Sequence, residues 1–160
     1  MKAITAFFTA ICLLFCASAE ISPTIIDNAF SLVIPETWLE CAPADETAAP
    51  LICLSDGQTV LTIEREEIPQ EYASLELQQM YLMENGHVEA FVSTFSDAED
   101  APQFILYNHL ESSTALCRTL IPEKGMYTFS FSPVAPDAEY GQTILDMMAT
   151  FTITDDTGAE

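Results

Sequence analysis

The chain has 160 residues, of which 25 are acidic and four are basic, so its net charge at neutral pH is −21. Such a charge repels nucleic-acid phosphates and anionic lipid headgroups, which excludes nucleic acid as a partner. The acidic residues are scattered along the chain, so they either solvate the surface or attract a basic protein partner. The length is that of one domain, which can bury a core without help from a metal.

The N-terminus carries the features of a secretory signal peptide. Lys2 precedes an apolar run over residues 3–16, and the small residues Ala17-Ser18-Ala19 follow it. This pattern predicts cleavage before Glu20 and a periplasmic or secreted protein. The run is shorter than the roughly 20 apolar residues of a membrane helix, so no transmembrane anchor is expected in the mature form.

Two other interpretations of this segment stay open. A lipoprotein would need a small residue before its lipidated cysteine, but Phe15 precedes Cys16 and Ile11 precedes Cys12. The segment could also be a buried helix of the domain. We expect a signal peptide over residues 1–19, one domain over residues 20–154 and a disordered tail over residues 155–160. The mature form would keep three basic residues against 25 acidic ones, a net charge of −22.

Three cysteines remain after the predicted cleavage. Cys41 and Cys53 enclose a short loop rich in alanine, proline and acidic residues, and an exported protein can keep a disulfide between them. Cys117 shares strand parity with Ala115 and Ile121, which predicts a buried free thiol. A bridge between Cys53 and Cys117 is the alternative that the sequence leaves open.

The pattern of apolar residues and turns predicts strands and two helices. Asp56-Gly57 between two apolar runs is a strong hairpin signal. The expected strands, in chain order, cover residues 30–34, 51–54, 59–66, 88–96, 104–110, 114–121, 126–132 and 151–154. A first helix is expected from Pro69 to about Asn85, and a second begins at Pro136. Tight turns favour an antiparallel sheet, so the predicted class is α+β.

Each predicted helix has an apolar side. In the first, the expected buried side carries Tyr72, Leu75, Met80 and Met83, while Gln78 belongs to a polar stripe. The second has a regular apolar stripe, made of Tyr140, Ile144, Met147, Met148 and Phe151.

Two segments resemble a known family. Residues 30–38 (FSLVIPETW) form a strand followed by Pro and Trp, and residues 126–133 (MYTFSFSP) lead towards the helix end at residues 147–151 (MMATF). With the order of elements between them, the chain resembles the PsbP/DcrB-like family, which includes the Mog-type Ran-binding fold. The resemblance implies an α/β/α sandwich with six or seven antiparallel strands flanked by helices. It also implies that the chain is a non-enzymatic binding or accessory protein, and it identifies no catalytic residues.

The two histidines occur in the same motif, His-x-Glu, at both ends of one predicted hairpin. If its turn centres near Glu99, His87 lies opposite Glu111 and Glu89 lies opposite His109. Two imidazoles and two carboxylates could hold a divalent metal such as zinc. The simpler interpretation is a pair of surface His–Glu contacts, because a register shift of one residue separates the four side chains.

We therefore expect an exported, non-enzymatic binding or accessory protein of the cell envelope that works through protein–protein contacts. It would use a sheet edge or a groove beside Trp38, although a lone Trp after a strand more often packs at the core edge. The alternative is a periplasmic protein that binds a metal or small ligand through the His-x-Glu motifs. No nucleophile motif or phosphate-binding loop supports an enzyme.

Overall fold

The computed structural model consists of two antiparallel sheets and two helices. It describes residues 23–45, 47–68, 73–86, 88–109, 113–134 and 140–154. The predicted signal peptide over residues 1–19 and the predicted tail over residues 155–160 lie outside this range.

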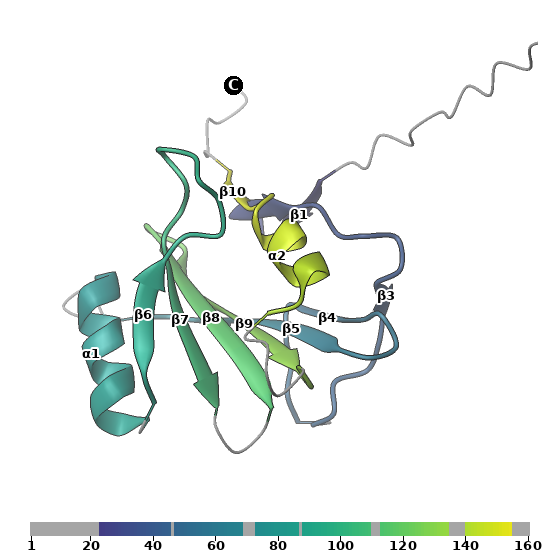
Figure 1. Cartoon of the computed structure of the whole chain (residues 1–160), viewed down its shortest axis with the longest axis horizontal. Helices are drawn as coiled ribbons and strands as arrows, with labels where there is room; N and C mark the ends of the chain where they lie inside the picture. The colour runs from purple at the N-terminus through teal and green to yellow at the C-terminus, as the bar shows by residue number, and fades with distance from the viewer. Residues whose placement is uncertain are drawn as a thin grey trace, which may run out of the picture.

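The larger sheet has seven strands in the order β3-β4-β5-β9-β8-β7-β6, and every neighbouring pair is antiparallel. Its edges are therefore β3 and β6, which lie at opposite ends of the sheet (Figure 1). The bounds are β3 Leu39–Glu40, β4 Ile52–Ser55, β5 Val60–Glu66, β6 Ala90–Ser93, β7 Phe104–His109, β8 Thr114–Ile121 and β9 Gly125–Ser132.

The smaller sheet has three strands in the order β1-β2-β10. It joins the beginning of the described chain, β1 (Thr24–Ile26) and β2 (Phe30–Leu32), to its end, β10 (Thr152–Ile153). The helices are α1 (Leu75–Asn85) and α2 (Gln142–Met148). Figure 1 shows α1 beside β6 and α2 close to the three-stranded sheet.

The predicted hairpin at Asp56-Gly57 is confirmed. The carboxylate of Asp56 accepts hydrogen bonds from the backbone N–H groups of Gln58 and Thr59, both at 2.8 Å. Gly57 has φ of +90°, a backbone conformation that favours glycine. The turn places β4 and β5 in register, with Ser55 paired with Val60.

Side chains alternate across the large sheet and form two apolar clusters. On one face, Phe129 and Phe131 of β9 pack with residues of α2 and of the small sheet in the main core. The second cluster contains Leu82 of α1 with Ile105 and Tyr107 of β7. Because Ile105 and Tyr107 alternate with Phe104 of the main core, the two clusters lie on opposite faces of the sheet.

The predicted starts of the two helices, Pro69 and Pro136, lie outside the described residues, and the described helices begin at Leu75 and Gln142. Ser74 is extended, and its side chain accepts a hydrogen bond from the N–H of Leu77, so it caps α1 before Leu75. Gly141 is likewise extended before α2. The predicted burial of α1 was also wrong, because Gln78 is buried whereas Met80 and Met83 are exposed. The stripe of α2 is confirmed at Ile144, Met147, Met148 and Phe151.

The predicted antiparallel sheet with helices is thus observed, and its strands outnumber its helices. The four strands expected between the helices are present as β6 to β9. Sequence analysis missed β1 and β3, which are short. None of the helices in the described part of the chain is long and apolar enough to cross a membrane.

Candidate functional site

A groove lies beside β3, at the edge of the large sheet that is opposite β6. Its volume is about 760 Å³. One side is the segment that connects β2 to β3, and the other is the loop that connects β3 to β4. The lining residues are mainly apolar side chains and prolines, namely Ile34, Pro35, Trp38, Leu39, Cys41, Pro43, Ala48, Pro50, Leu51, Ile52, Cys53 and Leu54, together with Thr24, Glu36 and Glu40.

Trp38 joins this groove to the main core. Pro35 stops the preceding strand segment, and its carbonyl accepts a hydrogen bond of 2.9 Å from the N–H of Trp38, which closes a turn. The side chain is 5% exposed and belongs to the main core, so the core-edge interpretation is correct. Trp38 also lines the groove, and its buried indole Nε1 has no hydrogen-bond acceptor among the described residues.

The outer edge of β3 carries backbone groups that face away from β4. The N–H of Cys41 donates to the carbonyl of Cys53 over 3.0 Å, which marks these opposed residues as a hydrogen-bonded pair. Hydrogen bonding alternates along an antiparallel strand, so the N–H and C=O of Glu40 point outward. Both Leu39 and Glu40 are exposed, and this edge therefore has the groups that an additional strand needs.

Cys41 and Cys53 meet at the inner side of the groove. The register that pairs Leu39 with Ser55 and Glu40 with Leu54 brings the two cysteines opposite each other. Both are free thiols in this structure, with their Sγ atoms 3.1 Å apart. Burial, together with the neighbouring Cys41, raises the pKa of Cys53 to about 11. The predicted disulfide between them stays a prediction, and the contact supports it.

Cys117 has a different environment. It is a free thiol on β8 and is completely buried in the main core, as its strand parity predicted. Burial raises the pKa of its thiol well above the ordinary value. A thiol that is buried and protonated is a poor nucleophile, so Cys117 contributes packing rather than chemistry.

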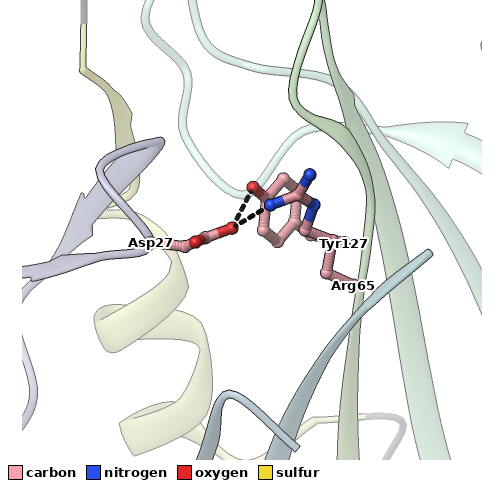
Figure 2. A network of polar contacts seen from close by, with 3 residues as sticks. All are labelled: Asp27, Arg65 and Tyr127. Carbon is pink, nitrogen blue, oxygen red and sulfur yellow. Dashed lines mark hydrogen bonds and ion pairs between the residues drawn. The ribbon is translucent and has the colours of Figure 1, made fainter. Parts of the chain in front are cut away.

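A polar network links the two sheets on the face that carries the main core (Figure 2). Asp27 lies in the turn between β1 and β2, where its φ of +53° is one that Asp tolerates. Its Oδ2 accepts a hydrogen bond from the hydroxyl of Tyr127 at 2.8 Å and an ion-paired hydrogen bond from Nη1 of Arg65 at 3.0 Å. Arg65 and Tyr127 are paired on β5 and β9, so the network ties the small sheet to the large one.

The electrostatics of this network indicate a structural role. The hydrogen bond from Tyr127 and the neighbouring Arg65 hold the pKa of Asp27 below its ordinary value. Burial and the bond to Asp27 raise the pKa of Tyr127 to about 12. The carboxylate stays charged and the phenol stays neutral at physiological pH, which keeps both hydrogen bonds in place. Sequence analysis missed this network, whose only local signal is the turn-forming Asp27-Asn28 pair.

We expect Tyr127→Phe to lower the free energy of unfolding by about 1.5 kcal/mol at pH 7, because Asp27 loses a hydrogen bond to its charged carboxylate. A lowered carboxyl pKa contributes stability above the unfolded value of about 3.9, and this contribution is lost as the pH falls through the folded pKa. The difference between wild type and variant should therefore shrink below about pH 4. Urea denaturation of both proteins from pH 7 to pH 3 measures it. A difference that is constant over this range contradicts the assigned role.

The predicted metal site depends on a strand register that differs from the observed one. Ala90 pairs with Tyr107, which is one residue away from the pairing that would bring Glu89 opposite His109. His87 and Glu111 lie outside the described residues. Within the described part of the chain, no group of three or more potential ligands is close enough to hold a metal. The zinc site stays an untested prediction, and the register removes the pairing on which it was based.

Comparison with models of known protein families, with curated proteins and with solved structures found no match to this chain. The resemblance to the PsbP/DcrB-like family therefore rests on the residues and the order of elements alone.

Proposed function

We propose that this chain is an exported, non-enzymatic binding or accessory protein of the cell envelope, and that its groove beside Trp38 binds another protein. The single observation that carries the proposal is the groove itself, which combines an apolar lining with an edge of β3 that pairs with no strand of the described chain. Binding sites of this kind join a mostly apolar surface to a few polar groups that set orientation. The signal peptide pattern at residues 1–19 supports export to the periplasm or the medium.

The composition of the groove favours binding over catalysis. Among the described residues, its ionisable side chains are two glutamates and two cysteines, and no histidine, lysine or arginine lines it. Three prolines, Pro35, Pro43 and Pro50, restrict the backbone on both sides. A surface that is restricted before binding loses less conformational entropy when a partner is bound. Membership of the PsbP/DcrB-like family, with its α/β/α layers, is part of the same proposal and is supported by the order of elements.

A photo-crosslinking residue in place of Leu39 tests the proposal in the exporting cell. Leu39 is 69% exposed and lies at the groove, so we expect illumination to produce a covalent adduct with another protein. The matched control places the same residue at Leu77, an exposed leucine on α1 at the other end of the sheet. Equal adducts at both positions, or none at Leu39, would overturn the proposal.

A further inference from the structure

We infer that the groove binds an extended, positively charged peptide segment, which adds to the edge of β3 as a further antiparallel or parallel strand. This inference rests on the proposed function and names the chemistry of the partner. It is carried by three features of the described residues: the direction of the backbone groups of β3, the apolar lining next to them, and the charge of the groove.

The backbone of β3 provides the first feature. In the described part of the chain β3 pairs with β4 alone, and the bond from Cys41 to Cys53 directs the N–H and C=O of Glu40 away from it. An extended peptide that meets such an edge forms main-chain hydrogen bonds without regard to its sequence. The side chains of the peptide then alternate between two faces, so its specificity comes from what lies beside the edge.

Apolar surface beside the edge provides the second feature. Leu39 and Leu51 are both large apolar residues that line the groove and remain exposed. Every second side chain of an added strand can cover them, which removes apolar surface from water. The buried indole N–H of Trp38 has no acceptor among the described residues, so a peptide carbonyl that reaches it would satisfy this donor.

The third feature is charge. Glu36 and Glu40 line the groove and are exposed, and no basic residue of the described chain lines it. The described basic residues, Arg65, Arg118 and Lys124, all lie elsewhere, on β5, on β8 and in the turn before β9. The net charge of −21 adds a long-range attraction for cations. A segment that alternates apolar residues with lysine or arginine therefore fits the groove better than a neutral or acidic one.

The test is a titration with synthetic peptides. Binding is monitored through the fluorescence of Trp38, which is the only tryptophan in the chain. The probe is a peptide of alternating lysine and valine. The controls are a peptide of alternating glutamate and valine, and a peptide with the lysines and valines in separate blocks. We expect the alternating basic peptide to change the fluorescence at saturation, the block peptide to bind at least about tenfold more weakly, and the acidic peptide not to bind.

Methylated peptides test whether the segment binds as a strand. One form of the basic peptide carries N-methyl groups on its lysines, and the other carries them on its valines. An added strand donates hydrogen bonds from one edge only, so we expect one form to lose binding and the other to keep it. If both forms bind equally, the peptide does not add to the sheet and the inference is wrong.

Charge variants test the location. Replacing the groove carboxylates in Glu36→Gln and Glu40→Gln should each weaken binding by about two- to fivefold. The matched pair Glu76→Gln and Glu84→Gln removes the same charge from exposed positions on α1 and should leave binding unchanged. The reason is that the Debye length at physiological ionic strength is about 8 Å, so charges farther away than this are largely screened. Equal losses in both pairs would show attraction to the whole molecule and would overturn the inference.

The outcome also separates this inference from the proposed function. If no peptide binds but the crosslink at Leu39 persists in cells, the occupant is not a basic strand, and the proposed function stands. If the acidic peptide binds as well as the basic one, the charge argument is wrong.

Discussion

Replacing Phe30 with alanine should lower the free energy of unfolding by about 3–5 kcal/mol. Phe30 belongs to β2 of the small sheet and is completely buried. Its ring stacks on Phe151 with centroids 4.8 Å apart and meets the edge of Tyr127 at 5.2 Å. It also lies 5.6 Å from Phe129, so it joins the small sheet to β9 and to the segment after α2. The truncation leaves a cavity where these elements meet.

The matched control is Phe91→Ala. Phe91 is the same residue type on the edge strand β6, but it is 59% exposed. Its truncation should change the free energy of unfolding by less than about 0.5 kcal/mol. Urea denaturation of both variants gives the comparison. The m value, which is the slope of the free energy of unfolding against urea concentration, should stay unchanged if only stability is affected. Similar losses at both positions would mean that Phe30 does not hold the two sheets together.

A disulfide between Cys41 and Cys53 should raise the free energy of unfolding by about 2–3 kcal/mol over the reduced form. The two cysteines are opposed across β3 and β4, a separation of about 5.5 Å between Cα atoms for a hydrogen-bonded pair, which suits a disulfide. Peptide mapping of the protein purified without reductant should recover the two residues linked and Cys117 free. The raised pKa of Cys53 keeps its thiolate scarce at pH 7, so spontaneous oxidation should speed up as the pH rises towards 11.

Two single variants separate the cysteines. Cys41→Ser should abolish the difference in stability between oxidised and reduced protein. Cys117→Ala should keep that difference, although it lowers the stability of both forms, because Cys117 packs in the core without a sulfur partner among the described residues. Recovery of Cys117 in a disulfide with Cys53 would contradict the assignment.

Local signals predicted the parts of the fold that form between neighbours in the sequence. The Asp56-Gly57 turn predicted the hairpin of β4 and β5, and alternation predicted β9, in which Tyr127, Phe129 and Phe131 are buried. These signals are reliable because a turn residue and a strand period act within a few positions of the chain. For the same reason the apolar stripe of α2 was predicted correctly.

Local signals failed where neighbouring elements decide burial. The apolar side of α1 was assigned to Met80 and Met83, yet α1 packs through Leu82 beside β6, and Gln78 is buried with it. A helix that covers only one edge of a sheet buries a narrow stripe, and periodicity alone does not say which stripe that is. The predicted register of β6 and β7 was wrong by one residue, and one residue is enough to move a side chain to the opposite face.

Composition and local patterns in the sequence established the acidic charge and the position of Trp38, three residues after Pro35, and they predicted export through residues 1–19 and an antiparallel sheet with helices. How distant segments meet became known from the three-dimensional structure alone. The pairing of β10 with β2 spans most of the chain, and it forms because Phe30 and Phe151 bury their rings together. The groove beside β3 likewise forms from two separate connections, whose contact depends on packing that no short stretch of sequence encodes.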